Sequence, residues 1–367
     1  MKKLSLILAL IFIFCCCGCK GEKDNVSSGE DTSALIQQYL PTDMALSDKN
    51  VDFIGRFKEV EGGHQFSWSG STIRAGFVGT EIKAVLELVQ KYQHTDYLEI
   101  VVDGTIHKTI TLYPNVKRSE WLIYDLEYGY HTIEIIKRTE QLSLMAFYGF
   151  EYPEGCYPAP APARADRRIE FIGESITSGY GVMRMDGSRG FYYSEQDVLH
   201  TYGYLVAKAL NAEYTILGMS SAGIVKHPIS ERWNTYGGTV IEEPYITPAE
   251  DIPDLVVIYL GTIDNHGKIP DSQFEAGYAD FIREVRSVYP DSHILCTIGG
   301  ITNEPYNVIS KVAEDFKANG DNKIHHYKII ASRDGENMCG GDFHPNANAH
   351  AAMAEELTTF IQNNIDF

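Results

Sequence analysis

The sequence has few cysteines, a shortage of positive charge and no apolar run long enough to span a membrane. Of its 367 residues seven are cysteine, and four of these lie within the first 19 positions. The other three, Cys156, Cys296 and Cys339, are too few for a disulfide framework, although one bridge between two of them stays open. No Cys and His spacing typical of a zinc site occurs, and we expect neither a metal nor another cofactor.

Positive charge is scarce, with 31 Lys and Arg residues against 50 Asp and Glu residues and a formal net charge of -19. Such a chain would be repelled by a phosphate backbone, which excludes nucleic acid as an expected partner and suits a neutral polymer better. The hydrophobic content of 44% and the charged content of 22% are those of a globular protein. The length predicts two domains, each able to bury its own core.

The N-terminus carries a targeting segment. Two lysines precede the apolar run from Leu4 to Phe14, and Gly18-Cys19 follows it, which is typical of a bacterial lipoprotein cleavage site with Cys19 lipidated. A plain secretory signal is the alternative. We therefore expect residues 1–19 to be a signal segment and residues 20–50 a flexible polar tether. The protein would be exported across the inner membrane and held at the cell envelope or surface through lipid alone.

Residues 51–157 lack sustained helical periodicity. Short alternating runs such as Thr72–Phe77 and Glu81–Leu88 are separated by turns, and Asp103-Gly104 between two such runs is typical of a β-hairpin. This pattern predicts an antiparallel β-sandwich. Its large aromatic residues are expected in the core rather than on a ligand platform: Phe66, Trp68 and Phe77.

The pattern changes after a stiff Pro/Ala linker at residues 158–165. From residue 166 to residue 367, strand-like runs alternate with helical stretches. This alternation predicts an α/β domain of three layers, in which helices cover both faces of a parallel sheet and the active site lies at the carboxyl ends of the strands. The strand-like runs begin at Ile169, Tyr214, Leu255, His293 and His326.

A serine and a histidine stand where acyl-transfer chemistry would need them. Ser175 follows the first strand in Gly-Glu-Ser-Ile-Thr, at the start of the next element, where free N–H groups can hold a developing oxyanion. His344, in Asp-Phe-His-Pro, lies on the loop that enters the last helix. Together they are the two halves of a nucleophile and general base.

These two blocks resemble the first and last blocks of the GDSL-type, or SGNH, hydrolases. The chain does not carry the Gly-x-Ser-x-Gly elbow, because Thr177 stands at the second glycine position. It is most similar to carbohydrate esterase family two, acetyl esterases with a jelly-roll β-sandwich before the hydrolase domain. The resemblance implies a serine esterase that removes O-acetyl groups from polysaccharides or oligosaccharides such as xylan and glucomannan.

The resemblance also assigns the donors of the oxyanion hole. It implies the N–H groups of Ser175 and Gly223, the latter in the second block Met219–Gly223. In the third block Ile263 replaces the family's asparagine, and an isoleucine side chain cannot donate, so we expect a weakened hole. Asp342 precedes His344 by two residues instead of three, so either its carboxylate or a main-chain carbonyl would orient the imidazole.

Substrate contacts are the least specified part of the sequence. Trp233, in a polar and aromatic loop, either stacks on a sugar ring or packs inside the protein. Asp264 and Asn265 either shape the pocket or cap a turn. Two other functions stay open: a lipid or thioester acylhydrolase on the same scaffold, and a non-catalytic carbohydrate-binding protein that lost a donor at Ile263.

The lipid anchor yields the first prediction. The variant Cys19→Ser should move from the membrane fraction to the soluble fraction, because it removes the thiol that would carry the lipid. Fractionation of cells producing either form measures this. Unchanged membrane association of the Cys19→Ser variant would contradict the anchor.

Overall fold

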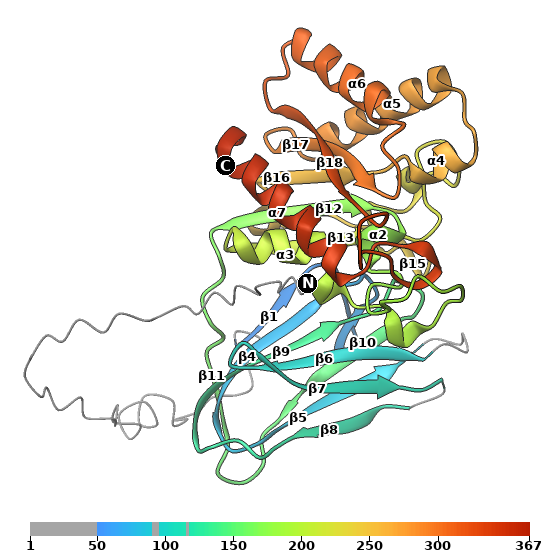
Figure 1. Cartoon of the computed structure of the whole chain (residues 1–367). Coiled ribbons are helices and arrows are strands. Elements are labelled where there is room, and N and C mark those ends of the chain that lie inside the picture. Colours follow the sequence, from blue (N-terminus) through green and yellow to red (C-terminus); the bar gives the residue numbers. More distant parts are fainter. Residues whose placement is uncertain (1–49, 90–94, 115–116) are drawn as a thin grey trace, which may run out of the picture.

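The computed structural model describes residues 50–89, 95–114 and 117–367. The expected signal segment, its Cys19 and nearly all of the expected tether lie outside these residues. Two domains are stacked on each other in Figure 1, with an antiparallel sandwich below and a parallel sheet covered by helices above. Both parts have the architecture expected from the sequence.

The sandwich consists of two antiparallel sheets. The first sheet has the order β1 (Val51–Ile54), β4 (Thr72–Gly79), β9 (Gly129–Lys137), β6 (Asp96–Val102) and β7 (Thr105–Leu112). The second has the order β2 (Phe57–Val60), β3 (Gly63–Phe66), β10 (Met145–Glu151), β5 (Ile82–Leu88) and β8 (Ser119–Ile123). Their facing side chains form one apolar core that contains Phe66 and Phe77, both fully buried. Trp68 is also buried, but it packs against the other domain.

The β6–β7 hairpin has the turn that its sequence indicates. Asp103 and Gly104 have φ values of 50° and 75°, and two consecutive positive φ values are the mark of a type I′ turn. The strands on either side pair from Val102 with Thr105 outward.

The sequence predicted that the linker begins at residue 158, but the last strand of the sandwich continues to Ala159. Residues Tyr157–Ala159 form β11, which pairs with β4 through Pro158 and Phe77. A proline fits there because β11 is an edge strand, where no partner needs its missing N–H group. The Pro/Ala segment is thus partly tied to the sandwich.

The second domain is built on a parallel five-stranded sheet. Its order is β13 (Ala212–Gly218), β12 (Arg167–Gly173), β16 (Leu255–Tyr259), β17 (His293–Gly300) and β18 (Ile324–Ser332). On one face pack α3 (Tyr202–Ala209) and α7 (Ala347–Asn364), and on the other α5 (Asp271–Val288) and α6 (Tyr306–Ala318). Smaller elements complete it: α2 (Ser175–Ser178), α4 (Thr262–His266), and the hairpin β14 (Thr235–Gly237) and β15 (Ile241–Pro244).

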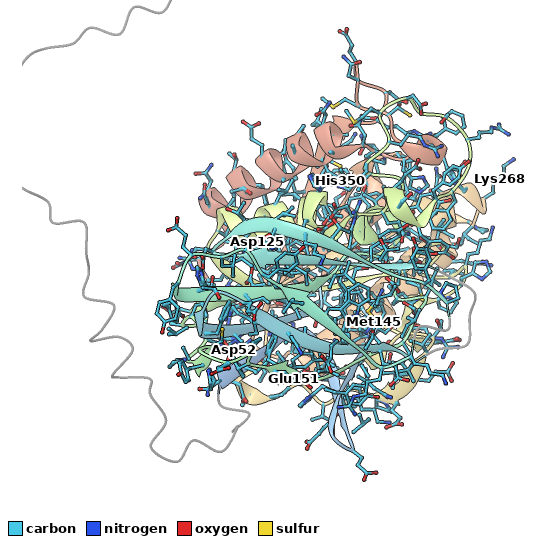
Figure 2. The ribbon with its side chains drawn as sticks, turned by 90° about the horizontal axis from the view of Figure 1, so that it is seen from below. Asp52, Asp125, Met145, Glu151, Lys268 and His350 are labelled. Carbon is cyan, nitrogen blue, oxygen red and sulfur yellow. The ribbon has the colours of Figure 1, made fainter. Side chains whose placement is uncertain are left out.

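Buried polar contacts hold the two domains together. Arg56, only 1% exposed, leaves the β1–β2 turn and donates to the Glu170 carboxylate in β12 at 3.0 Å. Arg74 in β4 donates to Glu213 in β13 at 2.9 Å. Because an unpaired buried charge is costly, Arg56 depends on the other domain for its carboxylate partner. Arg74 pairs across the boundary as well, although it also contacts Asp52 in its own domain at 3.1 Å. Figure 2, seen from below, shows the sandwich strands in front of the second domain.

Membrane and disulfide features are limited in the part of the chain that the structure describes. No helix there is both long and apolar enough to cross a bilayer. Cys156, Cys296 and Cys339 all keep free thiols, and the first two are buried. The possible bridge between two of them is therefore not formed.

Candidate active site

The end of β12 presents Ser175 through a tight turn into α2. A side chain at Gly173 would place its Cβ 2.1 Å from the Thr177 hydroxyl oxygen, so the strand can turn this sharply only with glycine there. Gly179 ends α2 with a φ of 82°, a conformation that also favours glycine. Ser175 is the first residue of α2, where N–H groups have no partner within the helix.

His344 reaches Ser175 from the loop before α7. Its Nε2 lies 2.9 Å from the Ser175 Oγ, and its Nδ1 lies 3.1 Å from the main-chain oxygen of Asp342. A carbonyl can only accept, so Nδ1 carries the proton and Nε2 is left free to accept from the hydroxyl. The loop's fixed backbone therefore selects the tautomer that a general base needs.

The Asp342 carboxylate has another partner. It accepts a hydrogen bond of 3.3 Å from the hydroxyl of Tyr180, whose ring packs on the His344 imidazole with centroids 4.4 Å apart. Of the two ways of orienting His344, the structure shows the main-chain carbonyl. Tyr180 was not identified from the sequence, although it stands between Gly179 and Gly181, just after the first block.

Burial controls the ionisation of these groups. Desolvation lowers the pKa of His344, although the main-chain oxygen of Asp342 partly opposes the shift. Burial also raises the pKa of Glu174, the neighbour of Ser175, to about 8, while nearby polar groups of Thr262 and Ile263 act in the opposite direction. A neutral imidazole at moderate pH is the form that accepts a proton.

Gly223, whose N–H the resemblance assigns to the oxyanion hole, lies in a tightly folded loop. Its N–H donates to the His227 carbonyl at 3.2 Å, and a Cβ on it would meet the Asp264 carboxylate at 2.6 Å. The glycine is needed because the loop folds tightly on itself, not because substrate approaches.

Ser221 has the free N–H group of this loop. In residues 220–226 the other N–H groups donate to Glu140, Met219, His227 or Asp264. Ser221 is exposed and has a φ of 66°, a left-handed conformation that residues other than glycine seldom adopt. The Met219 N–H donates to the Gly173 carbonyl at 3.0 Å, which places this loop beside Ser175.

Asp264 holds the same loop through hydrogen bonds to its main chain. Its carboxylate accepts from the N–H groups of Ile224, Val225 and Lys226 at 2.8, 2.8 and 3.0 Å, and the residue is 2% exposed. Both oxygens are therefore occupied within the protein, as in the alternative in which Asp264 caps a turn.

Trp233 is also not a sugar platform. It is completely buried, its indole N–H donates to the Glu284 carboxylate at 2.6 Å, and its ring packs between Phe281 and Tyr289. The internal packing role is the one found. Sequence could not decide this because the same residue type serves both purposes.

The third block forms the first turn of α4, after β16. Ile263 is half-buried there, and its apolar side chain offers no donor. The Asn265 amide lies 3.4 Å from the Thr302 hydroxyl, so it ties α4 to the loop after β17. Within the described residues no group of three or more His, Cys, Asp or Glu side chains is placed to hold a metal ion.

Family models match both domains. One described as carbohydrate esterase 2 N-terminal matches residues 53–162, and one described as the GDSL-like lipase/acylhydrolase family matches residues 171–352. The chain is 30% identical over 323 residues to cellulase/esterase CelE of Acetivibrio thermocellus. The aligned region covers 83% of this chain but only 38% of that protein. It is 25% identical over 350 residues to an acetylxylan esterase/glucomannan deacetylase of Cellvibrio japonicus, covering 88% and 91% of the two chains.

Solved structures agree with these matches. A family two carbohydrate esterase from Clostridium thermocellum, in complex with cellohexaose, is 27% identical with a TM-score of 0.80, over 86% of this chain and 99% of that one. An acetyl xylan esterase from Butyrivibrio proteoclasticus, 18% identical with a TM-score of 0.79 over 87% and 97% of the chains, has the same fold. The chain therefore belongs to the family two carbohydrate esterases, with that family's N-terminal domain in front of a GDSL-like lipase/acylhydrolase domain.

Proposed function

We propose that this protein is a serine esterase that removes O-acetyl groups from polysaccharides or oligosaccharides such as xylan and glucomannan. The observation that carries the proposal is the 2.9 Å contact between Ser175 Oγ and His344 Nε2, with Nδ1 held by a main-chain carbonyl. This is the arrangement of an activated hydroxyl nucleophile.

The reaction proceeds in two halves. Ser175 Oγ attacks the acetyl carbonyl while His344 Nε2 takes its proton, and the imidazolium then returns this proton to the departing sugar hydroxyl. Water next attacks the acetyl-serine, again losing its proton to His344, and acetate leaves. The Asp342 carbonyl accepts from Nδ1 throughout and stabilises the imidazolium.

The oxyanion of each tetrahedral intermediate needs hydrogen-bond donors at the same edge of the sheet. Ser175 supplies its own N–H from the start of α2, and the loop after β13, which contains Ser221 and Gly223, supplies a second N–H. These loops begin side by side because β12 and β13 pair in parallel up to Gly173 and Gly218. Fixed dipoles of this kind stabilise the transition state without reorganising during the reaction.

Acetylated carbohydrate is supported as substrate by the relatives. A relative that aligns over most of both chains is named an acetylxylan esterase/glucomannan deacetylase, and a structural relative was solved with cellohexaose. The net charge of -19 is compatible with neutral polysaccharide.

Acetate release tests the proposal directly. Wild-type protein should release acetate from acetylated xylan and glucomannan, whereas Ser175→Ala should lose nearly all of this activity because it removes the attacking oxygen. A comparison of acetyl and octanoyl model esters distinguishes a long-chain acylhydrolase, which would prefer the octanoyl ester. No acetate release by wild type would favour a non-catalytic binding protein.

The role of the Asp342 carbonyl gives a sharper prediction. Asn tolerates the left-handed backbone at this position, where φ is 50°, and keeps the carbonyl, so Asp342→Asn should retain turnover within about tenfold. His344→Ala removes the base itself and should abolish most activity. A loss of about 10⁴-fold in Asp342→Asn, the size expected for a carboxylate that orients the base, would show that its side chain acts instead.

Ile263 supplies a test of the oxyanion hole. Replacing Ile263→Asn places an amide donor in the loop after β16, on the other side of β12 from Ser221, and should raise turnover by roughly tenfold. Asn265→Ala is the matched control in the same helix, because the Asn265 amide contacts Thr302, and should leave turnover unchanged. Kinetics with an acetyl ester measure both. The reverse pattern would mean that Asn265 has taken over the donor role.

The cellular location is a separate proposal. A lipid on Cys19 would hold the exported enzyme at the cell envelope, next to polysaccharide that arrives from outside. Its support is the order of lysines, apolar run and Gly18-Cys19 in the sequence. The first residues lie outside the described part of the chain, so the Cys19→Ser fractionation decides this point.

A further inference from the structure

The ring of Tyr180 packs directly on the imidazole of His344. The two ring centroids are 4.4 Å apart and the ring planes are inclined by 35°, so the rings meet more nearly face to face than edge to face. Tyr180 follows α2, and its N–H donates to the Ser175 carbonyl at 3.0 Å. The turn that presents the nucleophile therefore also presents a ring to the general base.

Tyr180 is held in one orientation by its surroundings. Its hydroxyl donates to the Asp342 carboxylate at 3.3 Å, and its ring lies nearly parallel to that of Phe191, with centroids 4.7 Å apart. Phe191 belongs to the loop after α2, which Arg184 fixes by donating to the Glu195 carboxylate at 2.9 and 2.8 Å. The ring that faces His344 is thus already oriented before substrate arrives.

The positive charge that forms on His344 has a neutral hydrogen-bond partner. The group that accepts from Nδ1 is the main-chain oxygen of Asp342 at 3.1 Å. Desolvation is the largest influence on His344, and it lowers the pKa because it disfavours the imidazolium. Since a buried charge is costly unless nearby groups oppose it, the protonated base needs further stabilisation.

Other charged or titratable groups also act on His344. Asp342, on the same loop, favours the imidazolium, whereas Arg333, after β18, disfavours it. His350 in α7 stays neutral, because burial lowers its pKa to about 3. The Tyr180 hydroxyl stays neutral too, because burial and the nearby Asp342 carboxylate raise its pKa to about 12. Tyr180 therefore acts on His344 as an uncharged ring.

The face of an aromatic ring is electron-rich and attracts a cation that lies within about 6 Å of the ring centroid. We propose that Tyr180 is a positioning residue of the esterase site, whose ring face stabilises the imidazolium that His344 becomes when it takes the proton from Ser175. This inference rests on the proposed function and adds to it a second source of imidazolium stabilisation besides the Asp342 carbonyl. Because the charge develops only during the reaction, the attraction stabilises the transition state more than the bound substrate.

Two rings of similar shape test the proposal. Tyr180→Phe keeps an electron-rich face, whereas pentafluorophenylalanine at position 180 reverses the polarity of that face. Tyr180→Phe should keep kcat on a soluble acetylated xylo-oligosaccharide within about threefold of wild type. The fluorinated ring should lower kcat by about three- to thirtyfold relative to Tyr180→Phe, while KM changes little.

The pH profile of the same two proteins gives a second measurement. His344 must be neutral to accept a proton, so kcat/KM rises with pH as the imidazolium loses its proton. A ring that no longer stabilises the imidazolium lowers the pKa of His344, and the pH at half-maximal kcat/KM should be about 0.5 to 1.5 pH units lower with the fluorinated ring than with Tyr180→Phe. Coincident profiles and equal kcat in the two proteins would overturn the proposal.

Tyr180→Leu distinguishes attraction from simple shielding. Loss of the attraction should move the pH profile to lower pH, whereas loss of a shield would admit water, which stabilises the imidazolium and moves the profile to higher pH. Tyr204→Leu is the matched control, because the Tyr204 ring packs on Tyr214 at 5.2 Å instead of on His344. It should lose thermal stability but keep the wild-type kcat and pH profile. A shift to higher pH in Tyr180→Leu, or an equal downward shift in Tyr204→Leu, would contradict the proposal.

Titration of the His344 imidazole by NMR separates this inference from the esterase function, because it needs no turnover. His344→Ala identifies the signal, and the pKa of His344 should be lower with the fluorinated ring than with Tyr180→Phe. If wild type releases acetate and Ser175→Ala does not, but the two rings give the same His344 pKa, the role of Tyr180 alone is wrong. If wild type releases no acetate, the esterase function fails, and the titration still decides whether the ring stabilises the imidazolium.

Discussion

The parallel pairing of β12 with a neighbour on each side is the constraint on which the site depends. β13 pairs with it along seven residues and β16 along five, so all three strands end at the same edge of the sheet. The nucleophile, the loop with a free N–H and the third block are brought together by strand register alone. His344 must then be delivered from a segment 169 residues away, which the helix α7 does by packing on the same sheet.

The general architecture and the reacting pair could be predicted because they depend on local patterns. Alternation of strands and helices, the Asp103-Gly104 turn and the blocks around Ser175 and His344 are all contained in short segments. The finer assignments could not, because hydrogen-bond partners decide them. Gly223 and Ser221 are two residues apart, and which N–H stays free depends on the acceptors that the folded loop meets.

Both domains contribute to one working unit. The polar contacts across their boundary are buried, so separating the domains would leave Arg56 and Glu170 as unpaired charges. Glu140, on the loop between β9 and β10, extends this dependence to the loop after β13, because it accepts from the Ser220 N–H at 2.8 Å. No short sequence pattern connects position 140 with position 220, and such a contact becomes visible only when the chain is folded.

The main-chain carbonyl behind His344 has a consequence for how this site tolerates change. Every amino acid has a main-chain carbonyl, so no side-chain replacement removes the partner of the His344 Nδ1. What restricts the choice of residue at position 342 is therefore the backbone conformation and not the chemistry of the side chain. Asp342 and Phe343 have φ values of 50° and 61°, which β-branched residues adopt poorly. In the sequence, the partner of His344 is thus indicated by residues that tolerate a left-handed backbone. A search for a third, acidic member of a triad would not find it.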